Sequence, residues 1–286
     1  MGALLAACSA LSFGVGDFLG GLSARRMPAV LAALTAQVAG LVLLVGLALL
    51  VGGSAAGADL AVGAAAGTSG ALGLVLFYWA LAEGKMSVVA PVSAVMSALV
   101  PLVFGLVDGE RPSTVALLGA LAALPAIVLI AREPGDAADP DERSPDPTGR
   151  RQRQVLAAAV IAGLGFGGFF VFLSRSGDGS GMWPLVSARG TAATIVAVTA
   201  LVLRPGRFTG PGLRAGMLGG CFDVAANSLF LISTRQGLLT LVGVIGAMYP
   251  ASTVVLARVV LQERLARHQL WGLALAAVAV AAIAAG

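Results

Sequence analysis

Charged residues are scarce in this sequence of 286 residues, where Asp, Glu, Lys and Arg together make up 11%. A soluble domain carries about 25%. Lysine is nearly absent, since Lys85 is the single lysine among 18 Lys and Arg residues. Hydrophobic residues make up 58% of the chain and the mean hydropathy is +0.95. A soluble fold of this length cannot bury so much apolar surface, so the sequence predicts a protein that lies in lipid.

Residues for metal, disulfide and nucleotide chemistry are also few. The two cysteines, Cys8 and Cys221, lie far apart inside apolar runs and form no disulfide framework. The lone histidine, His268, has no second histidine with which to build a metal site. No GxxxxGK[ST] motif for nucleotide binding occurs. We therefore expect no enzyme and no cofactor. The net charge of +4 comes from arginines between apolar runs, which indicates membrane anchoring and not nucleic-acid binding.

Ten apolar segments are long enough to cross a bilayer, which takes about 20 residues each. The expected spans are residues 3–22, 29–51, 60–82, 86–107, 114–131, 154–174, 183–203, 213–234, 238–260 and 268–285. A charged, proline-containing stretch, 132–153, separates them into two sets of five and is predicted to be a flexible linker. The sequence therefore predicts an all-α polytopic membrane protein with domains 1–131 and 154–286.

The two sets are internal repeats. Adding 153 to a residue number in the first half gives its counterpart, so that Phe13 pairs with Phe166 and Glu110-Arg111 with Glu263-Arg264. An odd number of helices in each repeat turns the second repeat upside down, which is the inverted-repeat architecture of many secondary transporters. Basic residues in equivalent loops also change sides between the halves. We therefore expect two inverted five-helix repeats around a central cavity.

Both repeats end with the same signature. A Glu-Arg dipeptide is followed eight residues after the arginine by a glycine, Gly119 or Gly272, in the last span. In the first repeat, the aromatic and small residues 77–84 precede a span that contains Pro91. Over all ten spans the chain resembles the EamA family of the drug/metabolite transporter superfamily. The resemblance implies a ten-helix basket that exports metabolites, amino acids or drugs across the bacterial cytoplasmic membrane.

The orientation of the chain in the membrane stays open. The linker and the loops on its side hold thirteen basic residues, and the opposite loops hold three. The positive-inside rule then places the linker in the cytoplasm and both termini outside. The family resemblance implies the reverse, with both termini in the cytoplasm.

Ionisable side chains inside spans cost about 2.5–3.5 kcal/mol on insertion scales and indicate function by default. Asp17, Arg189 and Asp223 lie well inside expected spans, and none of them is repeated in the other half. Asp223 and Asn227 are four residues apart and therefore share one helix face. At its depth Arg189 needs either a path to the membrane interface or a carboxylate partner, for which Asp17 and Asp223 are the candidates. For Arg189, Asp223 and Asn227 a bond between helices is the alternative to a role in the cavity. For Asp17 the alternative is a position near the membrane surface.

Two tyrosines complete the candidate substrate site, which comprises Asp17, Tyr78, Arg189, Asp223, Asn227 and Tyr249. The aromatic rings suit a cationic or aromatic substrate, although anchoring at the membrane interface is an alternative. Glu110 and Glu263 precede helices, where a carboxylate interacts favourably with the helix dipole, so we expect them to be structural. We also expect close helix contacts at the pairs Gly63/Gly67 and Gly216/Gly220.

Together these features predict a secondary transporter that works by alternating access in the bilayer. Its expected partner is a small-molecule substrate. Coupling to a proton or other ion gradient is also expected to be possible. The sequence is compatible with either a monomer or a dimer. Two alternatives remain: a carrier or flippase of lipid-linked molecules, and a membrane scaffold that transports nothing.

Overall fold

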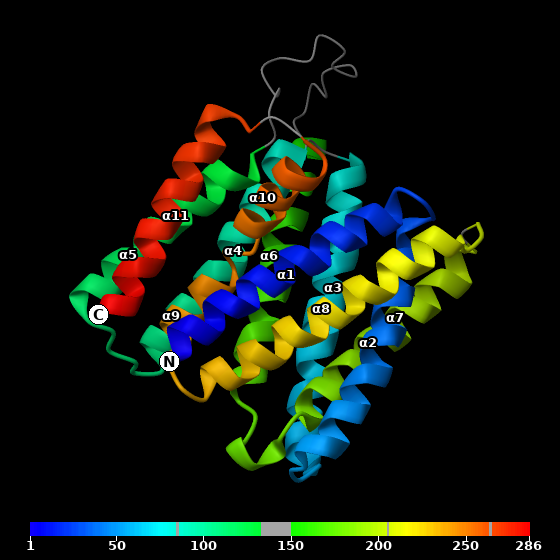
Figure 1. Ribbon diagram of the computed structural model, residues 1–286, viewed down its shortest axis with the longest axis horizontal. Helices are drawn as coiled ribbons and strands as arrows, with labels where there is room; N and C mark the ends of the chain where they lie inside the picture. The colour runs from blue at the N-terminus through cyan, green and yellow to red at the C-terminus, as the bar shows by residue number, and fades with distance from the viewer. Residues whose placement is uncertain (84–85, 133–149, 205, 263–264) are drawn as a thin grey trace.

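A computed structural model describes residues 1–83, 86–132, 150–204, 206–262 and 265–286. The described elements are all helical (Figure 1). Most of the expected linker, the dipeptide Glu263-Arg264 and the side chain of Tyr78 lie outside the described residues. The first repeat holds α1 (Gly2–Ala24), α2 (Ala29–Val51), α3 (Gly57–Glu83), α4 (Met86–Val107) and α5 (Thr114–Ala131). The second holds α6 (Arg150–Ser174), α7 (Trp183–Leu203), α8 (Gly210–Thr234), α9 (Leu239–Gly246), α10 (Pro250–Val260) and α11 (Arg267–Ala285), with a short 3-10 helix, η1 (Asp178–Ser180).

Ten membrane spans are present in the described part of the chain, as the hydropathy predicted. The ends of two helices reach further than expected, for identifiable reasons. α6 begins at Arg150, inside the range predicted to be linker, and in its first turn Arg151 donates to Glu83 at 2.5 Å. α8 begins at Gly210 because Thr209 caps it, accepting a hydrogen bond from the backbone N–H of Gly212 at 3.2 Å.

The ninth span, expected over 238–260, is present over Leu239–Val260 but consists of two helices. α9 ends at Gly246, residues 247–249 form a turn, and α10 starts at Pro250. Proline has no backbone N–H to continue the helical ladder and its ring clashes with the preceding turn. Broken helices are a recurrent feature of the substrate sites of secondary transporters. The break places Tyr249 at the junction of two half-helices.

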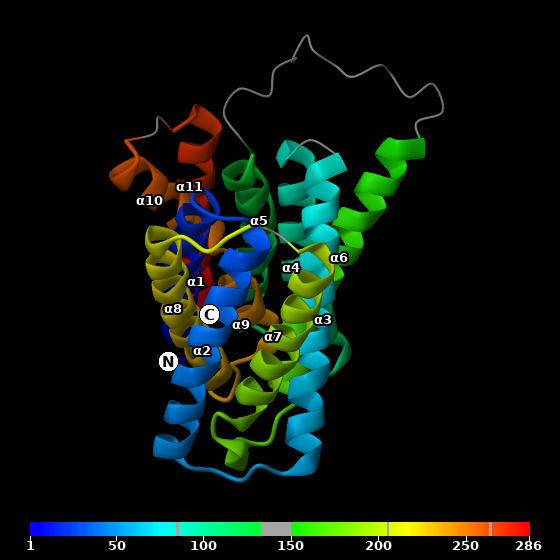
Figure 2. The ribbon, with the colours of Figure 1, turned by 90° about the vertical axis from the view of Figure 1, so that its right-hand side faces the viewer.

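The packing of the helices repeats between the two halves. α1 packs along α8, and its equivalent α6 packs along α3, the equivalent of α8. In the same way α2 contacts α8 while α7 contacts α3, and the equivalent helices α5 and α11 pack against each other. The equivalent helices α1 and α6 start at opposite ends of the bundle (Figure 2). The two five-helix repeats are therefore inverted and interlocked.

Glycines allow the closest of these contacts. A Cβ at Gly67 of α3 would overlap the carbonyl oxygen of Ala188 on α7, and one at Gly220 of α8 would overlap that of Ala36 on α2. Gly67 and Gly220 are equivalent in the repeat, and so are α7 and α2. The predicted small-residue contacts are thus confirmed, and they occur at matching places in both halves.

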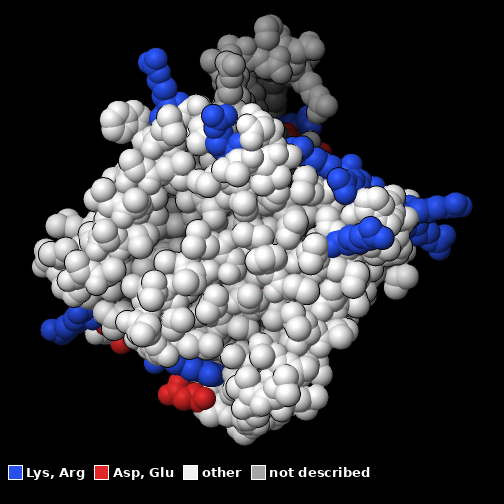
Figure 3. All heavy atoms as spheres, in the orientation of Figure 1, with Lys and Arg blue, Asp and Glu red and all other residues white. Residues whose placement is uncertain are grey.

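Charged residues lie at two opposite edges of the molecule and leave the face between them apolar (Figure 3). We call the end with loops 52–56, 108–113, 175–182 and 235–238 the termini face, because both termini lie there. The opposite end, with residues 25–28, 206–209, 261–262 and 265–266, is the linker face. The apolar belt between the two faces is the surface that contacts lipid acyl chains.

Candidate functional site

A polar cluster joins three helices inside the apolar bundle. Arg189 of α7 forms an ion pair with Asp223 of α8 and donates a second hydrogen bond, of 2.7 Å, to Gln37 of α2. One turn along α8, the side-chain amide of Asn227 donates to the carboxylate of Asp223 at 3.0 Å and to its backbone carbonyl at 2.8 Å. The carboxylate therefore receives hydrogen bonds from both an arginine and an amide.

The two charges of this cluster differ in burial. The side chain of Arg189 is 10% exposed and that of Asp223 is 31% exposed. Gly40 of α2 leaves room for the guanidinium, because a Cβ there would lie 3.4 Å from its central carbon. The pair is electrically neutral, and hydrogen bonds to Gln37 and Asn227 offset part of the cost of removing the two charges from water. The Oδ1 atom of Asn227 in this cluster is buried and has no hydrogen-bond partner among the described residues.

Asp17 occupies the inward face of α1 and is nevertheless exposed. Helical spacing places it on the same face as Ala6 and Ala10, both of which are buried in the bundle. Leu4 and Leu11 lie on the opposite face and are exposed toward lipid. A residue that is exposed on the inward face borders a hollow in the bundle. Among the described residues Asp17 makes neither an ion pair nor a hydrogen bond.

Aromatic side chains surround the position of Asp17 toward the termini face. Phe13, one turn earlier on α1, places its ring 6.2 Å from that of Tyr249 and 6.2 Å from that of Phe170 on α6. Tyr249 lies within electrostatic range of Asp17. α10 follows this tyrosine and packs along α1, although none of its residues is buried.

On the side of Asp17 toward the termini face, these rings continue into an aromatic layer between α1, α6 and α8. Phe170 packs against Phe230 of α8 at 4.4 Å between centroids and against Phe169 at 5.7 Å. Phe230 is fully buried and Phe170 is 6% exposed. Phe170 is the repeat counterpart of Asp17. Equivalent positions of the two repeats therefore hold an acidic residue, Asp17, in one half and a buried aromatic residue, Phe170, in the other.

Glu110 closes the termini face by bridging the two repeats. It lies in the loop after α4, and its carboxylate accepts hydrogen bonds from the backbone N–H groups of Leu239 and Thr240, each at 2.7 Å, and from the hydroxyl of Thr240 at 2.5 Å. These are the first two N–H groups of α9, which have no partner inside that helix. Glu110 is thus structural, as expected, but it caps a helix of the other repeat, while Ser113 caps its own helix α5.

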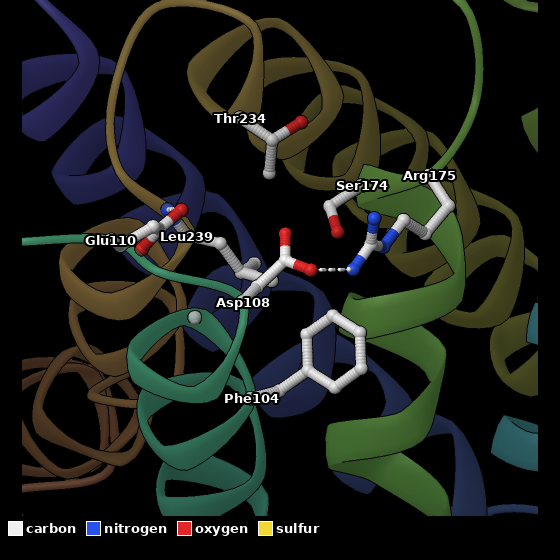
Figure 4. A pocket seen from close by; sticks show the side chains of 8 residues that line it. Phe104, Asp108, Glu110, Ser174, Arg175, Thr234 and Leu239 are labelled. Carbon is white, nitrogen blue, oxygen red and sulfur yellow. Dashed lines mark hydrogen bonds and ion pairs between the residues drawn. The ribbon is translucent and has the colours of Figure 1, made fainter.

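A small polar pocket lies beside this cap on the termini face (Figure 4). Across it, Arg175 at the end of α6 pairs with Asp108 at 2.6 Å and lies 4.7 Å from the ring centre of Phe104. Both members of the ion pair are about half exposed, at 46% and 50%. An exposed pair of this kind contributes little stability, so it is a contact that breaks and re-forms easily.

A third contact on the termini face holds α8 to the loop between α6 and α7. Arg235 donates to the carbonyl oxygens of Gly177 and Gly181, each at 3.2 Å, and to the hydroxyl of Ser180 at 3.0 Å. From the other side, Asp59 of α3 accepts from the backbone N–H of Gly177 at 2.8 Å. This loop is therefore fastened to both repeats.

The linker face is joined differently in the described residues. There Ser23 of α1 donates to Gly212 of α8, Arg151 of α6 binds Glu83 of α3, and Gln269 of α11 donates to Arg132 after α5. Each of these contacts links two helices that already pack along each other. On the termini face Glu110 also links helices that pack together, but Arg235 joins α8 to the loop between α6 and α7, although α8 makes few contacts with α6.

The structure brings part of the expected site together. Arg189, Asp223 and Asn227 form one cluster, and Asp17 and Tyr249 lie on the adjoining helices. The expectation for Arg189 named two carboxylates, and the partner is Asp223. The sequence reading missed Gln37, although an amide inside an apolar span was an available signal. It also missed Phe170, since a buried phenylalanine in an apolar helix has no distinguishing pattern.

Comparisons with known proteins agree with this architecture. A family model described as "EamA-like transporter family" matches residues 1–132 and 154–285. A solved structure described only as "Crystal structure of protein" is similar in fold, with a TM-score of 0.78 and 18% identity. The match covers 98% of this chain and 95% of that chain. No curated protein matches the sequence.

Proposed function

The chain belongs to the EamA-like transporter family, and on this basis we propose that it moves small organic solutes across a membrane by alternating access between its two repeats. The observation that carries the proposal is the difference between its two faces. At the termini face Arg235 fastens the end of α8 to the loop between α6 and α7, although α8 makes few contacts with α6. Glu110 and Arg175 add contacts between the loop after α4 and the ends of α9 and α6. Each of the three linker-face contacts described above joins helices that already pack along each other, so this face has no counterpart of the Arg235 contact among them.

This difference supports a state that is closed at the termini face and accessible from the linker face. Inverted repeats supply the second state, because each half can adopt the arrangement that the other half has now. Among the contacts that must break, the pair of Arg175 and Asp108 is half exposed, so water can replace it. The interlocked contacts of α1 with α8 and of α6 with α3 serve as fixed axes during the exchange.

Solute flux in reconstituted vesicles tests the proposal. A panel of amino acids, metabolites and drug-like solutes is loaded, and release is followed with and without a proton gradient. A second measurement blocks the transition: cysteines replace Asp108 and Arg175 in a chain whose Cys8 and Cys221 are serines, and a short thiol-specific cross-linker joins them. We expect cross-linking to stop flux and cleavage of the linker to restore it. Full flux in the cross-linked protein contradicts alternating access at this face.

Two other readings give distinct results in the same vesicles. A carrier of lipid-linked molecules moves labelled lipid between leaflets and leaves the soluble panel in place. A membrane scaffold moves neither. We place the protein in the bacterial cytoplasmic membrane and assign it the direction of export, and the orientation experiment below together with the direction of flux tests both statements.

A further inference from the structure

We propose that Asp17 is the anchoring carboxylate for a cargo that is an organic cation with an apolar, preferably aromatic, body. The proposal rests on the proposed transport function and names its substrate class. Asp17 is exposed on the inward face of α1, has no polar partner among the described residues, and lies above a layer of aromatic rings.

One acidic side chain inside the spans has no charged partner among the described residues. Three ionisable side chains lie well inside spans: Asp17, Arg189 and Asp223. Arg189 and Asp223 neutralise each other through their ion pair. Asp17 does not take part, and it forms no ion pair with Arg258 of α10, which has an interaction of its own. A carboxylate in a hollow with few polar neighbours attracts a cation more strongly than one in water, because the local dielectric constant is low.

The wall beside Asp17 suits the body of such a cation. Phe13 and Tyr249 are both partly exposed, and their rings lie 6.2 Å apart, on α1 and at the break between α9 and α10. Aromatic faces carry a negative electrostatic potential and attract ammonium groups within about 6 Å of their centres. The same faces bind apolar or aromatic groups by contact. An anionic solute finds neither a free cation nor a free donor beside Asp17 in the described residues, because Arg189 is already paired.

The residue equivalent to Asp17 in the second repeat explains why the cation would bind beside Asp17 and go no deeper. The counterpart of Asp17 is Phe170, which is buried against Phe13 and Phe230. A cation that enters from the linker face therefore meets Asp17 first and the aromatic layer directly beyond it. Asp17 and the layer together define a binding position with a charged side and an apolar floor.

The test measures binding to the full-length protein in lipid nanodiscs by equilibrium dialysis. The probes are phenyltrimethylammonium, a permanent aromatic cation, and benzenesulfonate, an aromatic anion of similar size. Empty nanodiscs correct for partitioning into lipid. We expect saturable binding of the cation and none of the anion. Asp17→Asn should weaken binding of the cation at least about tenfold, as expected for loss of a charge partner at low dielectric constant, and Asp17→Glu should restore most of it.

Matched variants separate the site from general effects of charge. Asp178→Asn removes the same charge from a side chain that is 90% exposed on the termini face and should leave binding unchanged. Tyr249→Leu should weaken binding of phenyltrimethylammonium more than binding of tetramethylammonium, because it removes an aromatic wall. If Asp17→Asn fails to fold, the preference of the unmodified protein for the cation over the anion still decides the question. Equal binding of both probes, or full affinity in a folded Asp17→Asn protein, overturns the proposal.

The flux experiment distinguishes failure of this inference from failure of the transport function. If neutral or anionic solutes are transported but the cation does not bind, the transport function is supported and the proposed substrate class is wrong. Asp17-dependent binding of the cation with no flux of any solute supports the binding site and contradicts transport.

Discussion

Arg189 of α7 and Asp223 of α8 neutralise each other through an ion pair inside the membrane spans, which hold few other charges. Gln37 and Asn227 complete the cluster, so three helices that are distant in sequence meet through one guanidinium and one carboxylate. Because this pair is internally satisfied, the charge that remains available in the spans is that of Asp17.

Removing one member of the pair should destabilise the protein, and the two members should differ. Asp223→Asn leaves the guanidinium of Arg189 unpaired at 10% exposure, which costs about 3–5 kcal/mol. Arg189→Gln leaves Asp223 at 31% exposure with the amide of Asn227 still bound, and should cost less. Thermal unfolding in detergent micelles measures both.

The double variant Arg189→Gln/Asp223→Asn is the control, because it removes both charges. It should be more stable than Asp223→Asn alone. A double variant whose loss equals the sum of the two single losses contradicts direct coupling between the residues.

The cap that Glu110 forms on α9 should be visible in hydrogen exchange. Glu110→Ala removes the acceptor of the backbone N–H groups of Leu239 and Thr240. Loss of such a cap typically costs about 1 kcal/mol, and these two amides should then exchange faster. Arg111→Ala, one residue further along the chain, changes the charge without touching the cap. Equal exchange at residues 239–240 in both variants contradicts the role of Glu110.

The sequence predicted contacts within a helix better than contacts between helices. Asp223 and Asn227 were placed on one face because a spacing of four is a local property of the helix, and they bind each other. The partner of Arg189 stayed open between two carboxylates, since helix spacing does not say which helices touch. Glu110 was expected at a helix N-terminus, but the helix it caps lies about 130 residues further along the chain.

Proline positions show the same limit. Pro91 and Pro101 lie inside α4, which remains continuous, whereas the corresponding span of the second repeat breaks before Pro250. The residue type is the same in all three cases. The outcome depends on the surroundings, since Tyr249 at the break packs against Phe13 of α1 and Ser252 of α10 donates to the carbonyl of Ala10 at 3.0 Å.

Glycine contacts that occur in both repeats should tolerate no side chain. Gly67→Ala places a methyl group against the carbonyl of Ala188, so α3 and α7 must separate and the melting temperature should fall. Gly220→Ala should do the same between α8 and α2. Gly46→Ala is the matched control, because nothing lies within 4 Å of its added Cβ. Alanine is favoured over glycine in a helix by about 1 kcal/mol, so the control should be neutral or slightly stabilised. A similar melting temperature in all three variants contradicts close packing at Gly67 and Gly220.

The distribution of arginines predicts which face of the protein meets the cytoplasm. The linker side carries thirteen of the basic residues that lie in loops and at helix ends, and the termini side carries three, so the linker face should be cytoplasmic. Single cysteines at Asp178 on the termini face and at Arg207 on the linker face report this, in a chain whose native cysteines are serines. A membrane-impermeant maleimide should label Asp178→Cys in intact cells and Arg207→Cys only after permeabilisation. The reverse pattern places the termini in the cytoplasm, as the family resemblance implies. The hollow beside Asp17 would then open away from the cytoplasm, and in the present state it would release cargo instead of accepting it.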